Sequence, residues 1–458
     1  MRSKTMVVAG IGCIAFGALA QSRPTAQEIA SLGNELTCMG AERAGSKDGA
    51  IPEFSGRWST SGGSGGTTAP ADAARAGDKY GDPYAAEKPL YVITAKNMQA
   101  YADKLSEGQK ALLQKYPATF RIPVYPTHRD FGYPAPLCKA AKENAEKAEL
   151  ADGGAGLHAA NGAPPFPIPK SGLELLWNHL LAGSVSTYRA QQDQAVVYPN
   201  GEIAWGKVDF QVFLPGFKAN AKSRTDGLYA YFKTKTLLPE RQKGEIVVGE
   251  EYYNNQKQPR LGYVYSPGTR RVRQLPSYGF DMPQGPGGFR TIDDDRLFNG
   301  SPERYEWTIA GKREMVVPFN AFRIQQASVK YADLLTPHHV NADYMRYELR
   351  RVWVLEAKLK SGYRHQYSRR VMYIDEDTWN GVMADNYDGR GKLWRVGMVN
   401  YFHAHDAGIY INTTSIYHDL ESGAYMTDKM TNARPPEINA GGLTAANFTP
   451  DTARMEGF

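Results

Sequence analysis

The pattern of hydrophobic positions along the chain changes from helical to strand-like at about residue 184. The helical part follows a capping signal at Ser171–Glu174, and its apolar residues repeat with the spacing of one helix face. These residues are Leu173, Leu176, Trp177, Leu180 and Leu181. From Ser184 onward apolar and polar residues alternate, and turn sequences such as Pro199-Asn200-Gly201 separate the alternating runs. The pattern predicts a covering helix over residues 171–182, followed by a long antiparallel sheet.

The run from Arg346 to Lys360 shows the alternation most clearly. Its apolar face carries Tyr347, Leu349, Trp353, Leu355 and Leu359. Its charged face carries Arg346, Glu348, Arg350, Glu356 and Lys358. The arginines here and at residues 364–370 are expected to form cross-strand ion pairs with Glu348, Glu356 and Asp375 on a solvated face. A docking surface for a membrane partner or anionic head groups is the alternative for this face.

The segments before the covering helix predict an irregular N-terminal arm. Capping residues, apolar spacing and a first-turn proline predict helices over Thr25–Leu36, Thr94–Lys115 and Pro136–Leu150. Alternating prolines at Pro164–Pro169 require an extended chain. The resulting division is an arm over residues 21–165, a sheet region over 166–435 and a C-terminal tail over 436–458.

The first twenty residues have the three parts of a secretory signal peptide. Arg2 and Lys4 supply the positive start, Met6–Leu19 is apolar or small, and Ala18-Leu19-Ala20 forms a cleavage site before polar Gln21. The apolar run is shorter than the roughly 20 residues that span a bilayer. The sequence therefore predicts cleavage after Ala20 and a periplasmic protein.

Charge and cysteine content restrict the function and predict one disulfide. The formal net charge of +6 is small for 458 residues, and the basic residues are dispersed among acids, which argues against a nucleic-acid partner. Cys13 lies in the predicted signal peptide, so Cys38 and Cys138 remain as a pair in an oxidising compartment. We expect a Cys38–Cys138 disulfide, and two buried free thiols are the alternative.

Several blocks of sequence resemble a known bacterial family. The blocks are Gly40–Gly45, Gly49–Pro52, Pro165–Pro169, Leu297–Trp307, Gly311–Met315, Val317–Asn320, Tyr347–Trp353 and Tyr373–Asp377. In this order, and over the whole mature chain, they resemble the family called domain of unknown function 1329. Its members are exported proteins of Gram-negative bacteria, often described as outer-membrane lipoprotein-sorting-like. The resemblance implies a fold similar to the Lol lipoprotein carriers and supplies no catalytic residues.

The expected fold class is therefore α+β. A large curved antiparallel sheet forms a half-barrel, amphipathic helices close it, and the irregular helical arm wraps it. Such a shape either leaves a hydrophobic pocket in its mouth or packs shut around a filled core. The residues predicted to line the pocket are Leu176, Trp177, Leu180, Tyr347, Leu349, Trp353 and Leu355.

Few patterns point to catalysis or to a bound metal. Gly62-Gly63-Ser64-Gly65-Gly66 matches G-x-S-x-G, but it lacks the preceding strand and following helix of a hydrolase nucleophile elbow. Asp293, Asp294 and Asp295 could hold a cation, or they could be turn acids neutralised by neighbouring arginines. His403 and His405 could be metal ligands on one strand face, but zinc needs three or four ligands. No cofactor is expected.

Three functions compete at this stage. The first is a non-enzymatic periplasmic carrier that binds a lipid or another hydrophobic molecule and passes it between membranes. Its possible partners are an inner-membrane transporter of the resistance-nodulation-division type and an outer-membrane protein. The second is an envelope hydrolase with a metal or carboxylate site. The third is a scaffold or adaptor with a filled core and an exposed apolar patch. A cavity in the structure would favour the first.

Overall fold

The computed structural model describes residues 23–58, 79–158, 160–162, 164–217, 227–275 and 280–457. The predicted signal peptide and the glycine-rich loop Gly62–Gly66 lie outside the described residues. Within these ranges, no helix is long and apolar enough to cross a membrane.

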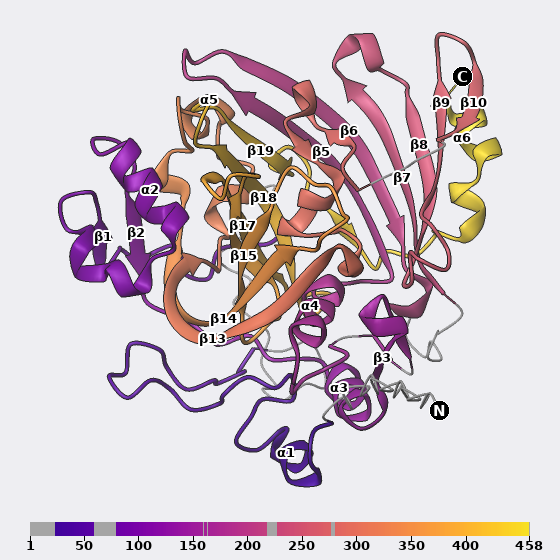
Figure 1. The fold of residues 1–458 in the computed structure, drawn as a ribbon. Coiled ribbons are helices and arrows are strands. Elements are labelled where there is room, and N and C mark those ends of the chain that lie inside the picture. Colours follow the sequence, from indigo (N-terminus) through magenta and orange to yellow (C-terminus); the bar gives the residue numbers. More distant parts are fainter. Residues whose placement is uncertain are drawn as a thin grey trace, which may run out of the picture.

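One large mixed sheet forms the body of the molecule (Figure 1). Its order is β1-β2-β14-β15-β16-β17-β18-β19-β5-β6-β7-β8-β9-β10, with β13 paired to β14 and β20 to β5. Its first part comprises β1 Tyr91–Ile93, β2 Ile122–Tyr125, β5 Thr187–Val197, β6 Ile203–Phe213, β7 Leu228–Leu238, β8 Ile246–Tyr252, β9 Leu261–Ser266 and β10 Arg271–Gln274. Its second part comprises β13 Tyr305–Pro318, β14 Tyr347–Leu359, β15 Arg369–Asp375, β16 Gly381–Tyr387, β17 Leu393–Ala404, β18 Ile409–Asp419, β19 Tyr425–Met430 and β20 Glu437–Ile438.

The prediction of a large, mostly antiparallel sheet is confirmed, with two differences. The strands β2 and β14 run parallel, so the sheet is mixed, and β1 and β2 come from the predicted arm. In the described part of the chain, β1 and β10 stand at opposite ends of the strand order, so the sheet is open. Two small separate sheets pair β3 Glu149–Ala151 with β4 Gly156–His158 and β11 Pro283–Gln284 with β12 Arg290–Thr291.

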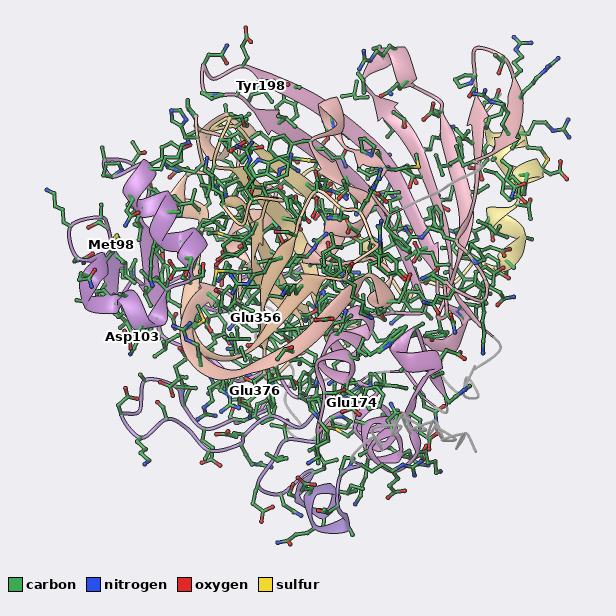
Figure 2. All side chains as sticks on the ribbon, in the orientation of Figure 1. Met98, Asp103, Glu174, Tyr198, Glu356 and Glu376 are labelled. Atoms are coloured by element: carbon green, nitrogen blue, oxygen red, sulfur yellow. A yellow bond between two sulfur atoms is a disulfide. The ribbon has the colours of Figure 1, made fainter. Side chains whose placement is uncertain are left out.

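The predicted hairpins form where turn residues interrupt the alternation. Strands β5 and β6 pair along their whole length around Pro199-Asn200-Gly201, where Gly201 has a φ of +89° that suits glycine. Tyr198, at this turn, is 40% exposed and lies at the end of the long hairpin (Figure 2). Strands β9 and β10 pair in the same way.

The helices are shorter than the sequence predicted, and one of the predicted helices is divided by an internal cap. They are α1 Ala26–Ser31, α2 Glu107–Lys115, α3 Ala135–Lys147, α4 Gly172–Leu181, α5 Tyr331–Leu334 and α6 Pro450–Glu456. The helix expected over 94–115 is a 3-10 segment, η2 Met98–Lys104, followed by α2. Leu105 is extended, and the Ser106 hydroxyl accepts a bond from the Gln109 amide, so a new helix starts there.

The predicted covering helix is α4, which packs against β13 and β14. The Ser171 hydroxyl caps it by accepting a bond from the Glu174 amide. A Cβ on Gly172 would lie 2.4 Å from the Trp307 carbonyl oxygen, so only glycine lets the helix start this close to β13. Leu175 is fully buried in the main hydrophobic core. Helix α4 thus covers the edge strand β13, which Figure 1 shows beside it.

A disulfide holds two parts of the N-terminal arm together, and a buried arginine of the arm fastens it to the sheet. The predicted bond between Cys38 and Cys138 is present and links the start of the arm to α3. The Arg129 side chain is 2% exposed and pairs with Asp377 at 2.7 Å. Its guanidinium also donates to the Pro52 carbonyl at 3.0 Å and to the Glu42 carbonyl. The arm therefore supplies acceptors that a buried charge requires.

The first half of the charged face of β14 is buried, which corrects part of the sequence prediction, while Glu356 and Lys358 in its second half remain accessible to solvent. The side chains of Glu348 and Arg350 are 0% and 3% exposed. Arg350 pairs with Asp375 at 2.6 Å and with Asp377 at 2.8 Å, and Arg346 pairs with Glu348 at 2.8 Å. The expected cross-strand pairs are therefore present, but the arm covers them. Arg346 and Arg350 are buried and cannot form a docking surface, whereas Arg364 and Arg369 are accessible to solvent.

The predicted C-terminal tail is part of the folded structure. It forms β20, the 3-10 turn η11 Ala445–Phe448, and α6. Ala453 of α6 packs against Ile246 and Tyr265 on one face of β8 and β9. The Lys233 ammonium on β7 pairs with Glu456 at 2.7 Å. This face of β7–β9 is therefore covered by the end of the chain, as Figure 1 shows for α6.

Candidate ligand-binding cavity

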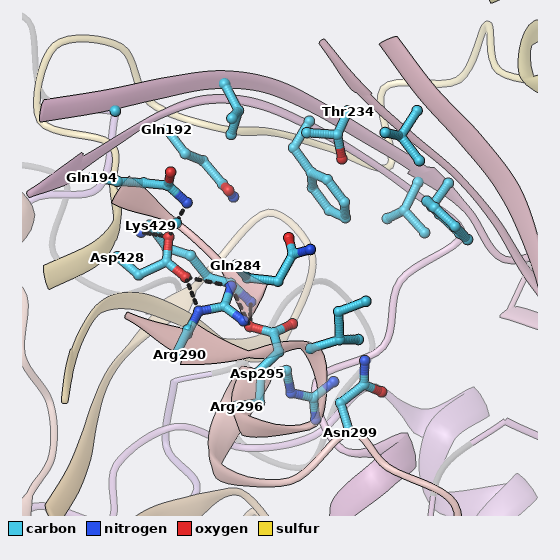
Figure 3. Close-up of a pocket in the computed structure, with 18 of the residues that line it drawn as sticks. Gln192, Gln194, Thr234, Gln284, Arg290, Asp295, Arg296, Asn299, Asp428 and Lys429 are labelled. Carbon is cyan, nitrogen blue, oxygen red and sulfur yellow. Dashed lines mark hydrogen bonds and ion pairs between the residues drawn. The ribbon is translucent and has the colours of Figure 1, made fainter. Parts of the chain in front are cut away.

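A cavity of about 970 Å³ lies between strands β5–β9 and the segment Met282–Asn299, called here the covering segment. This volume is at the upper end of the range for small-molecule pockets, roughly 300–1,000 Å³. Residues at the end of α4 and on β18 and β19 complete the lining. Figure 3 shows Thr234 of β7 on one side of the space and charged side chains on the other.

The sheet side of the cavity is an apolar wall. Its residues are Ala204, Val208, Phe210 and Val212 of β6, Ala230 and Phe232 of β7, Val247 of β8, and Val264 of β9. They occupy alternate positions, so they share the inner face of these strands. The intervening residues, such as Ile246 and Tyr265, point to the outer face and pack against α6. One face of these strands thus packs against α6, and the other face lines the cavity.

The covering segment approaches the apolar wall closely at Gly206 of β6. A Cβ at this position would lie 3.0 Å from the Pro286 side chain and 2.9 Å from the Gln194 side-chain oxygen. Pro286 starts the 3-10 turn η6 Pro286–Gly288, which lines the cavity. The glycine lets this turn lie against the strand.

Opposite the wall is the charged floor, defined as Arg290, Asp295, Arg296, Asp428 and Lys429. Arg290 Nη2 pairs with Asp428 at 2.7 Å, and Lys429 Nζ pairs with Asp295 at 2.7 Å (Figure 3). Burial raises the pKa of Asp295, but Lys429 and Arg290 outweigh it and lower the pKa to about 2. Both carboxylates are therefore fixed as acceptors within the floor.

The backbone of the charged floor contains unusual conformations. Arg296, Leu297 and Lys429 have φ values of +52°, +76° and +59°, which non-glycine residues rarely adopt. A β-bulge between Thr427 and Met430 accompanies Lys429. Such conformations cost about 1–3 kcal/mol each, persist where surrounding contacts hold them, and concentrate at functional sites. Here they direct Arg296 and Lys429 to the cavity lining.

The structure places only one of the seven predicted pocket residues on this cavity, within the part of the chain it describes. Leu180, near the end of α4, lines the cavity. Four others lie in the main hydrophobic core: Leu176, Tyr347, Leu349 and Leu355. Because α4 packs directly on β13 and β14, the space between them is filled. For these four residues the structure shows the filled core that was the alternative.

The two predicted pocket tryptophans lie in other surroundings. Trp177 packs with Leu157 and Phe166 in a separate cluster, and its indole nitrogen donates to the Gly154 carbonyl at 3.0 Å. Trp353 is partly buried, with the Lys312 ammonium 4.6 Å from its ring centroid. Both have structural contacts that account for them.

The three aspartates proposed as cation ligands are neutralised by the protein itself. Asp293 pairs with Arg370 at 2.6 Å and with His365 at 2.9 Å, and Asp294 pairs with Arg370 at 3.2 Å. Asp295 belongs to the charged floor. Among the described residues, no group of three or more His, Cys, Asp or Glu side chains is placed to hold a metal ion. The structure thus shows these carboxylates paired with basic side chains of the protein, as expected for turn acids with basic neighbours.

The two histidines proposed as metal ligands are separated by the end of β17. His403 is 2% exposed and stacks on Phe131 with ring centroids 4.1 Å apart. Burial lowers the pKa of His403 to about 3, so it is neutral at physiological pH. His405 lies in the turn after β17 and contacts the Tyr80 ring. The pair does not form a metal site in this structure.

A family model described as a protein of unknown function, DUF1329, matches residues 92–454. The chain belongs to the DUF1329 family. The resemblance seen in the sequence blocks is thereby confirmed. Among proteins similar to this DUF1329 member is the uncharacterized protein PA3922 of Pseudomonas aeruginosa. The two are 38% identical over 467 residues, which cover 99% of each chain.

Solved structures similar to this DUF1329 protein are more distant. A DUF1329 family protein from Desulfovibrio piger is 15% identical, with a TM-score of 0.41, and the match covers 59% of this chain and 92% of that one. The LolA superfamily protein NE2245 from Nitrosomonas europaea is 13% identical, with a TM-score of 0.38, and the match covers 62% and 100%.

The sequence contained a signal for the cavity that the prediction did not use. Strand β6 alternates small or apolar residues with Lys207, Asp209 and Gln211. That alternation marks an apolar face as clearly as the one in β14. What it could not show is which apolar face is packed shut and which is left open.

Proposed function

We propose that this DUF1329 protein is a non-enzymatic periplasmic carrier that binds a hydrophobic molecule in the cavity under the covering segment. The observation that carries the proposal is the apolar wall, which faces about 970 Å³ of space rather than a packed core. Large concave sites with mostly apolar linings and a few placed polar groups are typical of ligand-binding proteins.

In this proposal the protein passes its ligand between an inner-membrane transporter of the resistance-nodulation-division type and the outer membrane. The predicted signal peptide and the Cys38–Cys138 disulfide support a periplasmic location, because disulfides persist in oxidising compartments. Strands β5–β9 would act as the half-barrel wall that receives the ligand, with the covering segment on its other side.

Apolar burial alone gives such a site useful affinity. Each buried methylene contributes about 0.8 kcal/mol, so the fifteen of a hexadecyl chain contribute about 12 kcal/mol, from which an association cost of at least about 4 kcal/mol is subtracted. A net binding free energy of about −8 kcal/mol corresponds to micromolar dissociation. This strength suits a carrier, which must both take up and release its cargo.

A neutral fluorescent probe tests the proposal without involving charge. N-phenyl-1-naphthylamine should bind the purified protein at micromolar concentration, and hexadecanol should displace it. In Val208→Glu, a carboxylate enters the apolar wall, and probe affinity should fall at least tenfold, because an ionised group there must be desolvated. The matched control is Gln211→Glu, which places the same group on the opposite face of β6 and should leave binding unchanged.

Two results would contradict the proposal. One is a wild-type protein that binds neither the probe nor hexadecanol. The other is equal loss of binding in both variants, because this would place the probe outside the cavity. Thermal unfolding of both variants shows whether each is folded.

A further inference from the structure

Arg296 gives the charged floor a surplus positive charge. The floor holds three cations, Arg290, Arg296 and Lys429, and two carboxylates, Asp295 and Asp428. Asp428 is paired with Arg290, and Asp295 with Lys429. Among the described residues, no carboxylate lies within ion-pair distance of Arg296 in the structure. Its charge therefore has no acidic side chain as its own counterpart.

The other charged side chains of the lining do not remove this surplus. Glu251 pairs with Arg260 at 2.9 Å. Arg241 and Glu245 complete the charged lining, with one charge of each sign. Counted over the whole cavity, the surplus remains one positive charge.

The position of Arg296 is fixed by the fold. Its Nη2 donates to the His179 carbonyl at 2.9 Å and to the Ala182 carbonyl at 2.7 Å, at the C-terminal end of α4. A guanidinium has five N–H donors in a planar fork, so these contacts leave donors unused. The group is held in place before any ligand arrives, which reduces the entropy lost on binding.

Two neutral amides accompany Arg296 on the cavity lining. Asn299, three residues later, also lines the cavity (Figure 3). Asn412 of β18 lines it too, and its side-chain nitrogen is buried without a hydrogen-bond partner in the described structure. Buried donors without partners are uncommon, because each costs free energy. A positive fork with additional N–H donors matches an oxyanion, in particular a carboxylate or a phosphate.

We infer that the ligand is an anionic amphipath whose carboxylate or phosphate head group binds at Arg296 while its hydrocarbon chain lies along the apolar wall. This inference rests on the proposed carrier function and specifies the class of its cargo. The ion pairs Arg290–Asp428 and Lys429–Asp295 stay intact when the ligand binds, and the head group neutralises the charge of Arg296.

The test compares chains that differ only at the head group. Palmitate, hexadecyl phosphate and hexadecanol are used to displace N-phenyl-1-naphthylamine from the wild-type protein. Palmitate and hexadecyl phosphate should bind at least tenfold more tightly than hexadecanol, since a hydrogen bond to a charged group typically contributes this much. Inorganic phosphate, tested alone at the same concentrations, should not displace the probe, because it lacks the chain.

Two substitutions assign the head-group site. Arg296→Gln should remove the preference for anionic chains and leave hexadecanol binding intact. Asn299→Asp should do the same, because it adds a negative charge to the lining that carries Arg296 and so cancels the surplus positive charge. Arg241→Gln is the control, because Arg241 is an exposed cation of the same lining.

The outcomes separate this inference from the carrier proposal. If hexadecanol binds the wild-type protein as tightly as palmitate does, or if both Arg296→Gln and Asn299→Asp keep the preference, the head-group assignment is overturned and the carrier proposal survives. If inorganic phosphate displaces the probe as well as hexadecyl phosphate does, the site is one for free anions. If no chain binds, the carrier proposal and this inference fail together.

Discussion

Asp385 on β16 is a buried carboxyl group that should make the stability of the protein depend on pH. It is 0% exposed and accepts hydrogen bonds from the Tyr373 hydroxyl at 3.1 Å and the Ser106 hydroxyl at 3.2 Å. Ser106 is the N-cap of α2, so this carboxyl lies where α2 meets the sheet. Burial raises the pKa of Asp385 from 3.8 to about 6.

The raised pKa determines the sign of the effect. Between pH 4 and pH 6 the folded protein keeps the proton that the unfolded chain has lost. The free energy of unfolding therefore falls as the pH rises through this window, and the contribution is fully present below pH 4. A shift of about two pH units corresponds to about 3 kcal/mol, at roughly 1.4 kcal/mol per unit.

Urea denaturation of the wild type and Asp385→Asn from pH 4 to pH 7 measures this contribution. Asparagine stays neutral at every pH, so the stability of the variant relative to the wild type should increase by about 3 kcal/mol across the window. Asp333→Asn on α5 is the control, because this aspartate is exposed and should give a small, constant difference. A wild-type-to-Asp385→Asn difference that does not change with pH would refute the reasoning.

Two further predictions concern the buried charges and the disulfide. Glu348→Gln should destabilise the protein by about 3–5 kcal/mol in urea, because it removes the buried negative charge that Arg346 and Arg350 share. Glu356→Gln breaks an ion pair with Arg369 that is exposed to solvent, so it should lower the free energy of unfolding by at most about 1 kcal/mol. Equal destabilisation by the two substitutions would contradict the conclusion that burial makes Glu348 more important. Replacing both Cys38 and Cys138 by alanine opens a loop of 100 residues and should cost about 4 kcal/mol in thermal unfolding. An unchanged melting temperature would show that this bond does not restrict the unfolded chain.

Local sequence signals predicted which helices and strands form, but they did not fix where each helix starts and ends. The β5–β6 hairpin and the start of α1 follow from turn and capping residues that act over a few positions. The prediction of one long helix over residues 94–115 was wrong, because Ser106 caps a new helix. The spacing of apolar residues alone did not reveal that cap. The ends of a helix depend on single capping hydrogen bonds, and the spacing of apolar residues does not reveal them.

The site was harder to predict because it depends on which faces are covered. In β14 apolar and charged residues alternate as expected, yet the arm covers the first half of the charged face and α4 fills the space beside the apolar face. In β6 a similar alternation leaves Val208 and Phe210 facing open space. The difference arises from chain segments more than 50 residues away, such as the covering segment, and no local pattern encodes it.

The bonds of Arg129 determine how the N-terminal arm should respond in hydrogen exchange. The arm has only a small apolar cluster of its own, around Met39 and Phe54. If residues 23–58 of the arm detached, Arg129 would lose the Glu42 and Pro52 carbonyl acceptors of its guanidinium, which is costly in a buried environment. Opening of the arm and unfolding of the central strands are therefore one cooperative event. The Phe54 amide, bonded to the Arg43 carbonyl, should exchange as slowly as amides of the sheet.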